Sequence, residues 1–397
     1  MCFHFPPGDR VKIVQLITGS ADFGGAQAHV RDLADGLRAR GHECSVITGP
    51  PDGLFSDQLR AHGIVVHVLP HLRKALHPLN DSLAILQLVA RLRKLKPDLV
   101  AAHTAKAGFL GRVACALLGI PCVFTPHGWS IVDRASGKIN HIFKALERFG
   151  GTLGTGVITV CRDEHETGRA SDLVEQKKLF CVHNGIPDLP ALAQRNDDDL
   201  TVVMVARFCK QKDHSTLLRA LSRLKGYPWR LKLVGAGPLL EATRQLAGSL
   251  GLAQRVEFLG ECKNTTEILS QSSVFVLSTF YEAFPISILE AMRAGLPIVA
   301  TGVGGIAEAV AQGVSGFLVP PSRENLMAES LERLFTDASL RERFGRNGRE
   351  IFLERFTDKH MILRTLEVYR LLVNREVEHW PAENLTVAAS TAKPAGD

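Results

Sequence analysis

Short, mostly apolar runs alternate with stretches of helical periodicity along most of the chain. The first run, residues 11–18 (VKIVQLIT), leads into a glycine-rich turn, after which apolar residues recur at helical spacing. Such alternation with short connections is typical of a doubly wound parallel sheet. In the first half of the chain we predict strands at residues 11–18, 43–48, 64–69, 98–103, 121–126, 156–160 and 179–182. We predict helices at residues 55–62, 82–95 and 107–118, and a further helical stretch that ends at residue 148.

The periodicity disappears between residues 187 and 199, where the sequence becomes polar, and a second alternating series then begins. Its predicted strands are residues 200–206, 230–234, 256–259, 273–277, 297–300 and 316–319. We therefore predict two α/β domains, each with a Rossmann-like, doubly wound parallel sheet. The predicted parts are an N-terminal domain (1–187), a linker (188–199), a C-terminal domain (200–356), a crossover helix (357–378) and a disordered tail (379–397).

Length and composition agree with this division. A chain of 397 residues exceeds what one hydrophobic core normally organises. No apolar run approaches the roughly 18 residues of a membrane span, and the first residues show no signal-peptide pattern, so we expect a cytoplasmic protein. The eight cysteines have irregular spacings, which favours buried, reduced thiols over disulfides or a metal site.

The positive charge is concentrated in the first half. Residues 1–187 contain 22 Lys and Arg against 16 Asp and Glu, whereas the rest of the chain contains 25 of each. Two basic segments, residues 71–79 (HLRKALHPL) and 91–96 (RLRKLK), contribute to this excess. They predict peripheral, low-affinity contact with an anionic inner-membrane surface, although solvated helix and loop faces explain them nearly as well. No nucleic-acid-binding motif is present.

Residues 278–305 (STFYEAFPISILEAMRAGLPIVATGVGG) carry the strongest chemical signal. An apolar strand ends in a polar loop with Glu282, a helix begins after Pro285, and Glu290 lies in its first turns. The free amides at such a helix start, near Ile286 and Ser287, favour a phosphate. A carboxylate on either side can then accept hydrogen bonds from sugar hydroxyls. In the alternative interpretation, Ser287 and Glu290 form a capping box and Glu282 is a solvated loop residue.

Two cations follow the strand at residues 200–206. Arg207 and Lys212 lie five residues apart across the turn ARFCKQKDH, an arrangement that can hold a diphosphate. A solvated basic turn is the alternative, and Lys210 fits that description. The only Asp-x-Asp pattern lies in the predicted linker at residues 197–199, so we predict no catalytic metal and no cofactor.

Glycine-rich turns follow two predicted strands. Gly24 and Gly25 lie in the first, and Gly235 and Gly237 in the turn VGAGP. Both are candidates for contact with a nucleotide sugar, although glycines at such turns often serve close packing alone. An NAD-dependent oxidoreductase is a less favoured alternative, because the strand after the first turn ends in VITGP without the acid that holds a ribose.

Two histidines end neighbouring strands in the first half. His127 lies after a predicted strand in FTPHGW, and His103 ends the preceding strand in AAHTAKAG. Lys106 lies three residues after His103. A lone histidine is usually structural. Ligands of α/β sheets bind at the carboxyl ends of the strands, so His127 is placed where a ligand binds, and His103 and Lys106 are weaker acceptor-side candidates.

These motifs resemble those of the family 4 retaining glycosyltransferases, in the branch that builds bacterial capsule, exopolysaccharide and lipopolysaccharide. Residues 282–290 match the family's Glu-x7-Glu signature, and the similarity covers nearly the whole chain. Ala283 and Pro285 depart from the commonest pattern, as does Asp213, where glycine is frequent. The resemblance implies a GT-B fold, with the ligand between two domains and no required metal. It also implies that Arg207 and Lys212 stabilise the leaving pyrophosphate, that His127 contacts the transferred sugar, and that configuration is retained by front-face attack.

The predicted function is therefore transfer of a sugar from a nucleotide-diphosphate sugar to a lipid-linked glycan acceptor in surface polysaccharide synthesis. Arg207, Lys212, His127 and Glu282 are the predicted catalytic residues. Gly24, Gly25, Gly235, Gly237, Ile286, Ser287 and Glu290 are the predicted donor-binding residues. A sugar-nucleotide 2-epimerase of the same fold remains an alternative. The sequence does not specify the sugar, the base or the linkage.

Overall fold

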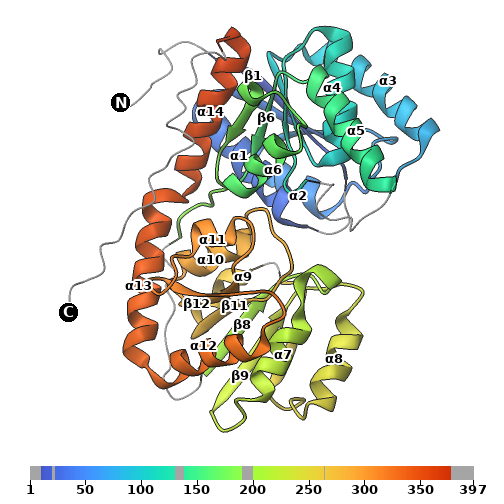
Figure 1. Ribbon diagram of the computed structural model, residues 1–397. Helices are drawn as coiled ribbons and strands as arrows, with labels where there is room; N and C mark the ends of the chain where they lie inside the picture. The colour runs from blue at the N-terminus through green and yellow to red at the C-terminus, as the bar shows by residue number, and fades with distance from the viewer. Residues whose placement is uncertain (1–9, 20–22, 130–137, 190–199, 263, 377–397) are drawn as a thin grey trace. The chain divides into compact units, whose positions relative to one another are not determined.

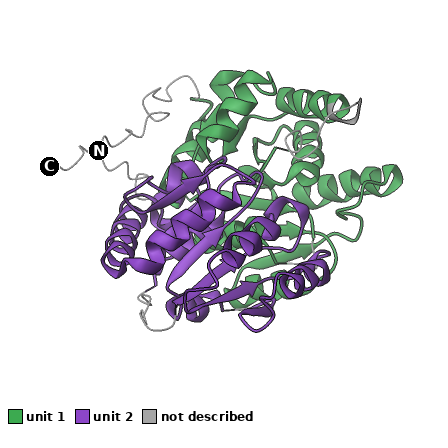
Figure 2. Ribbon diagram, turned by 60° about the horizontal axis from the view of Figure 1, so that its bottom comes forward, with its two compact units in different colours: residues 1–182, 362–397 green, residues 183–361 purple. Residues whose placement is uncertain are grey.

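The computed structural model describes residues 10–19, 23–129, 138–189, 200–262 and 264–376. The chain divides into two compact units, shown in Figures 1 and 2. Unit 1 comprises Met1–Val182 with Ile362–Asp397, and unit 2 comprises His183–Met361. Most of the predicted linker, residues 190–199, and the predicted tail, residues 379–397, lie outside the described residues.

Unit 1 contains a seven-stranded sheet in the order β3-β2-β1-β4-β5-β6-β7, with every pair of neighbours parallel. The strand order reverses between β1 and β4, which is the switch point where doubly wound folds bind ligands. The strands are β1 (Lys12–Ile17), β2 (Glu43–Thr48), β3 (Val65–Val68), β4 (Leu99–His103), β5 (Cys122–Thr125), β6 (Gly156–Thr159) and β7 (Leu179–Cys181).

Helices cover this sheet and bury its apolar side chains. Nearly all residues of β1, β4 and β5 are buried, as expected for a parallel sheet covered on both faces. The helices are α1 (Gly25–Ala39), α2 (Leu54–Ala61), α3 (Pro78–Leu95), α4 (Ala105–Leu118), α5 (Lys138–Leu153) and α6 (Arg162–Ala170), with a short 3₁₀ turn η1 (Gln176–Lys178). The final helix, α14 (Asp358–Asn374), begins in unit 2 and belongs to unit 1 from Ile362 onward.

Unit 2 repeats the arrangement with a six-stranded parallel sheet in the order β10-β9-β8-β11-β12-β13. Its switch point lies between β8 and β11. The strands are β8 (Leu200–Val205), β9 (Trp229–Val234), β10 (Val256–Gly260), β11 (Val274–Leu277), β12 (Ile298–Thr301) and β13 (Gly316–Val319). The helical segments are η2 (Lys210–Lys212), α7 (His214–Ser222), α8 (Leu240–Ser249), α9 (Thr265–Ser270), α10 (Ile286–Arg293), α11 (Ile306–Ala309), α12 (Glu324–Thr336) and α13 (Ala338–Arg355).

The predicted strands and the two doubly wound sheets are confirmed. Two helical predictions need correction. Helix α3 begins at Pro78, four residues before the predicted start, because proline at the first helical position loses no hydrogen bond and His77 caps the helix. Helix α6 was not predicted, because its sequence RDEHETGRA is almost entirely polar. No helix in the described ranges combines the length and apolar character needed to cross a membrane.

Candidate active site

The loops after β8 and β11 meet at the switch point of unit 2. The hydroxyl of Ser278 donates to the carbonyl of Asp213 (2.7 Å), and the amide of Phe280 donates to the carbonyl of Gln211 (2.9 Å). The Gln211 side chain donates in turn to the carbonyl of Tyr281 (2.7 Å). These bonds join two loops that are 70 residues apart in the chain, so the loop bearing Lys212 is held against the loop bearing Glu282.

The predicted glycine turn after β9 supports the β8 loop. Gly235 and Gly237 have φ angles of +139° and +152°, which side chains rarely adopt. A Cβ at Gly237 would lie only 2.4 Å from the carbonyl oxygen of Phe208, and the Phe208 amide donates to the carbonyl of Ala236 (2.9 Å). The two glycines therefore allow the turn to pack closely against the segment that follows Arg207. The side chain of Arg207 itself is exposed.

Lys212 and Glu282, predicted separately from two motifs, form a short ion pair. Their side chains are only 17% and 8% exposed, so the pair is largely shielded from water. Both lie at the carboxyl edge of the sheet, on η2 and on the loop after β11. An anionic ligand that engages Lys212 would release the Glu282 carboxylate for other hydrogen bonds.

Helix α10 begins where the sequence predicted, with Ile286 and Ser287 as its first two residues. The capping-box interpretation is not supported, because the N-cap is Pro285 and no side chain caps the helix. Glu290 instead accepts a hydrogen bond from the Thr265 hydroxyl at the start of α9 (3.0 Å). The first amides of α10 thus remain an anion-binding end beside half-buried Glu290.

The loop after β12 approaches the Glu282 segment through Gly304. This glycine has a φ of +51°, and a Cβ there would lie 1.8 Å from the Glu282 carbonyl oxygen. The next amide, of Gly305, donates to the carbonyl of Ala283 (2.7 Å). The glycine-rich end of β12 therefore fixes the backbone on which Glu282 is carried.

Sequence reasoning missed Asn184 and His183 in unit 2. The buried Asn184 amide donates to the carbonyl of Phe284 (2.9 Å), directly before the start of α10. His183 lies 2.7 Å from Glu308 of α11, between Nε2 and Oε2. The signal was a pair of polar residues, HN, directly after a buried strand.

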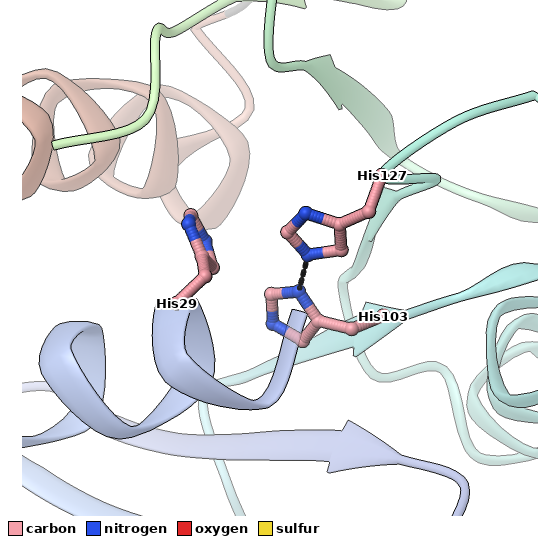
Figure 3. A group of neighbouring side chains, drawn as sticks. All are labelled: His29, His103 and His127. Atoms are coloured by element: carbon pink, nitrogen blue, oxygen red, sulfur yellow. Dashed lines mark hydrogen bonds between the residues drawn. The ribbon is translucent and has the colours of Figure 1, made fainter. Parts of the chain in front are cut away.

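Three histidines gather at the switch point of unit 1 (Figure 3). His103 ends β4, His127 follows the adjacent β5, and His29 comes from α1. His103 Nδ1 lies 3.0 Å from His127 Nε2, and the His29 ring packs edge-on against His127 with centroids 4.6 Å apart. The sequence predicted His103 and His127 but not His29, because helical position alone does not show which element a side chain faces.

Two members of the histidine cluster, His103 and His127, are kept neutral. Burial, with a smaller contribution from neighbouring His29, keeps the pKa of His103 and His127 well below the ordinary 6.5. The backbone is constrained as well, since Thr104 and His127 both have positive φ angles, +69° and +53°. Such conformations in residues other than glycine cost energy and are concentrated at functional sites.

One nitrogen from each of these histidines lies within 4.8 Å of the other two, a spacing that a metal ion can bridge. Three imidazoles are a donor set that zinc accepts. The facing nitrogens of His103 and His127 are, however, at hydrogen-bonding distance, and the second nitrogen of His103 lies 2.6 Å from the Gln15 side-chain oxygen. The same nitrogens of His103 and His127 thus form a hydrogen-bonded pair that Gln15 extends.

The remaining predicted residues of unit 1 are placed less centrally. Gly24 is the N-cap of α1, and its amide donates to the Gln27 side chain (3.2 Å), whereas Gly25 is the first residue of the helix. Lys106 is ion-paired with Asp81 of α3 (2.5 Å) and donates to the carbonyl of Ala75. The contacts of Lys106 anchor the segment around α3 rather than joining the histidines.

A buried carboxylate, which the sequence did not indicate, supports the segment that follows His127. Glu164 of α6 accepts from the amide of Val160 (3.1 Å), and the indole of Trp129 donates to the Glu164 carbonyl (2.8 Å). Burial raises the pKa of Glu164 to about 7, partly offset by backbone hydrogen bonds from Val160, Gly128 and Trp129. Glu164 therefore holds the backbone directly after His127.

Together, two doubly wound parallel-sheet units with this constellation at their strand ends define the GT-B class of glycosyltransferases. Comparison with known families agrees. Residues 23–188 match the model "Glycosyltransferase Family 4" and residues 187–351 match "Glycosyl transferases group 1". The two matches together span residues 23–351, and the chain belongs to the family 4 glycosyltransferases.

Relatives of known name span most of the chain. It is 28% identical over 312 residues to the Escherichia coli UDP-Gal:alpha-D-GlcNAc-diphosphoundecaprenol alpha-1,3-galactosyltransferase, covering 74% of this chain and 79% of that one. It is 29% identical over 385 residues to the alpha-maltose-1-phosphate synthase of Mycolicibacterium smegmatis, covering 88% and 95%.

Solved structures confirm the fold. The Anabaena Alr3699/HepE protein in complex with UDP and glucose superposes with a TM-score of 0.79 at 22% identity, covering 91% of this chain and all of that one. Sucrose-phosphate synthase from Thermosynechococcus elongatus gives a TM-score of 0.80 at 23% identity, covering 92% and 100%. At these identities the similarity establishes the GT-B architecture.

Proposed function

We propose that the protein transfers a sugar from a nucleotide-diphosphate sugar to a lipid-linked saccharide, with retention of configuration and without a metal ion. The observation that carries this proposal is the shielded Lys212–Glu282 pair, held at the switch point beside the N-terminus of α10. A cation, a carboxylate and free helix amides at one sheet edge match the charges of a sugar diphosphate. The Escherichia coli relative, whose name specifies a UDP-sugar and a diphosphoundecaprenol acceptor, supports this choice of substrates.

The chemistry requires the diphosphate to leave while positive charge develops at the anomeric carbon. Arg207, Lys212 and the amides of Ile286 and Ser287 would stabilise the departing diphosphate, as fixed charges and dipoles do most effectively in a shielded site. When the diphosphate engages Lys212, Glu282 becomes able to accept from sugar hydroxyls. Glu290 would hold a further donor hydroxyl from the first turns of α10.

A screen of sugar nucleotides by thermal shift tests this assignment. A ligand that binds only the folded state raises its stability by about 2.7 kcal/mol at 100 times its Kd, which gives a measurable rise in Tm. We expect one donor type to produce a clear shift that the Lys212→Ala variant loses. The proposal fails if no sugar nucleotide at millimolar concentration shifts the wild-type protein.

The proposed metal independence has its own test. Activity with the identified donor should persist in excess EDTA, because Arg207, Lys212 and α10 supply the positive potential. Complete loss in EDTA, restored by magnesium or manganese, would show that a metal and not these groups stabilises the leaving group.

We further propose that unit 1 meets the membrane surface where a lipid-linked acceptor resides. The helices α3 and α5 both pack on α4 (Figure 1), and together they leave large apolar side chains in solvent. Exposed basic residues flank this surface at both ends of α3. The helical surface comprises Leu79, Leu83, Leu86, Leu117, Ile142, Leu146 and Phe149, and the flanking cations are Arg73, Lys74, Arg93 and Lys94.

A further inference from the structure

A polar side chain lies in the middle of the buried central strand of unit 1. Gln15 is fully buried in β1, between apolar neighbours that form the core. Burying an amide without hydrogen bonds is costly, so its partners explain its presence. Its side-chain oxygen lies 2.6 Å from Nε2 of His103, which is also fully buried.

The hydrogen bonds continue from Gln15 toward the surface. His103 uses its other nitrogen, Nδ1, to contact Nε2 of His127 at 3.0 Å (Figure 3). Of the three hydrogen-bonded side chains, Gln15, His103 and His127, only His127 is half-buried, and it lies nearest to solvent. Among the described residues, no side chain forms a hydrogen bond to the outer nitrogen, Nδ1, of His127.

The chemistry of the amide sets the direction of every proton in this chain. An amide oxygen only accepts hydrogen bonds, so the proton of neutral His103 must be on Nε2. Its Nδ1 then carries a lone pair and accepts from Nε2–H of His127. The outer Nδ1 of neutral His127 is consequently unprotonated, and it can accept a hydrogen bond but cannot donate one.

We propose that Gln15 is a positioning residue that acts through His103 to fix His127 as a hydrogen-bond acceptor for a hydroxyl group of the sugar substrate. The inference rests on the proposed function, because that function places His127 against the transferred sugar. The inference adds the direction of the hydrogen bond between His127 and the sugar. An acceptor nitrogen binds a hydroxyl group, which donates, and does not bind an oxygen that lacks a proton. Removing the amide oxygen leaves both imidazoles free to exchange tautomers.

The groups around this chain keep it uncharged. His29 of α1 faces both other histidines, and the pKa of His103 and His127 is held low by burial. Beyond Gln15, the neighbours are the Cys44 thiol of β2, whose pKa burial raises to about 12, and the Tyr369 phenol of α14, whose pKa burial also raises. The Cys44 thiol and the Tyr369 phenol are uncharged at neutral pH, so neither competes with the amide in setting the tautomers.

The direct test is the tautomeric state of the histidines, read by long-range ¹H–¹⁵N correlation in protein labelled with ¹⁵N-histidine. Single His103→Gln and His127→Gln variants assign the two signals. We expect both residues of the substrate-free wild type to be neutral and protonated on Nε2. Protonation of His127 on Nδ1 would overturn the proposal, and is the result expected if the Gln15 amide faces His103 with its nitrogen. Stoichiometric zinc bound by both imidazoles would overturn it equally.

Two variants of similar volume separate positioning from packing. Gln15→Met removes the acceptor, and we expect a roughly tenfold lower kcat at every pH, an unchanged donor KM, and mixed His127 tautomers. Gln15→Glu keeps an acceptor, but its carboxylate raises the pKa of His103. Below that pKa, Nδ1–H of His103 donates to His127 and forces its proton to the outer nitrogen, so kcat should recover at alkaline pH and fall as the pH is lowered.

A purely structural role predicts the same loss in both variants, with no difference in pH profile, and that result would overturn the proposal. Wild-type kcat in Gln15→Met would overturn it too. The tautomers are measured without substrate. The direction of the hydrogen bonds from His127 through His103 to Gln15 is therefore tested even if the protein fails to transfer a sugar.

Discussion

The two units place their chemistry at the same position of the same sheet topology but with opposite electrostatics. In unit 2, Lys212 and Glu282 are ionic groups beside a helix N-terminus, and Arg207 is exposed on the adjoining loop. In unit 1, His103 and His127 are kept neutral by burial and linked to a buried amide. A duplicated architecture therefore supports two modes of recognition, one suited to a diphosphate and one to uncharged hydroxyls.

The difference follows from where each side chain emerges. The loops that leave the sheet edge of unit 2 expose Arg207 to water and pair the shielded Lys212 with Glu282, so neither cation is buried without compensation. The histidines of unit 1 lie at strand ends and on a packed helix, where a charge would lose its hydration. Substitutions that alter charge should therefore affect the two sites very differently.

The largest expected effect is in the ionic site. Lys212→Ala should lower kcat by roughly 10²- to 10³-fold, the range observed when one fixed group that stabilises developing negative charge is removed. The variant also leaves the largely buried Glu282 carboxylate without its cation. Steady-state kinetics with the identified donor measures the loss.

Lys210→Ala is the matched control, because it removes an exposed lysine from the same 3₁₀ turn. It should retain wild-type kinetics. Equal losses in the two variants would mean that the overall charge of the turn matters, and not the geometry of Lys212.

The neutral site should respond in stability to pH through Glu164. In the unfolded chain this carboxyl ionises near 4.5, whereas in the folded protein its pKa is about 7. Between these values the folded state retains a proton that the unfolded state has released, so stability falls as the pH rises. The difference is on the order of 3 kcal/mol, and Glu164→Gln should abolish it.

Urea unfolding at pH 5 to 8.5 measures this effect. Glu166→Gln is the control on the same helix, since Glu166 is exposed and hydrogen bonding from Arg169 lowers its pKa. That carboxyl contributes stability that is lost on acidification, the opposite direction, and the contribution is small at an exposed site. If Glu164→Gln keeps the wild-type pH dependence, Glu164 is not the buried acid that weakens unit 1 at alkaline pH.

The carboxylate pair of unit 2 separates turnover from binding. Glu282→Gln should lower kcat by roughly 10- to 100-fold with little change in donor KM, because its contacts strengthen as the sugar becomes cationic. Glu290→Gln should instead raise donor KM by about tenfold, the cost of weakening one hydrogen bond to a charged group. Glu267→Gln, on the exposed face of α9, is the control. Wild-type kinetics in both test variants would remove this pair from the donor site.

The sequence predicted the ionic site more completely than the neutral one. Lys212, Glu282 and Glu290 lie within contiguous motifs that follow apolar strands, so local pattern and the rule for parallel sheets were sufficient to place them at one end of the sheet. The pairing of Lys212 with Glu282 needed the structure, because it depends on the register of loops 70 residues apart.

The neutral site depends on tertiary packing that no local pattern reveals. Gln15 appears in an apolar run as an ordinary polar interruption, and His29 as one residue of an amphipathic helix. Glu164 belongs to a helix so polar that it was not predicted. Each gains its role only when β1, α1, β4 and α6 are packed together, which is why the sequence identified His103 and His127 but not the groups that hold them.

The smallest expected effect concerns the membrane. Exposed leucines recur on one face of α3 at positions 79, 83 and 86, and cations follow at its C-terminus. Each Lys or Arg near an anionic surface contributes about 1 kcal/mol, and salt screens it, so attachment should be weak and reversible. The buried part of an apolar side chain adds roughly 25 cal/mol per Å². Both contributions are needed, because neither alone provides stable anchoring.

Cosedimentation with liposomes therefore separates charge from apolar contact. We expect binding to anionic but not neutral vesicles at low salt, and its loss at high salt. Replacing Arg73, Lys74, Arg93 and Lys94 with Gln should reduce it, and so should replacing Leu83 and Leu86 with Gln, which keeps the charge. A matched control comes from unit 2, where the exposed residues Arg219, Arg223, Lys225 and Arg230 are replaced with Gln. This variant should bind vesicles like the wild type. If all variants remain in the supernatant with the wild type under every condition, the helical surface does not contact lipid, and the acceptor must reach unit 1 from solution.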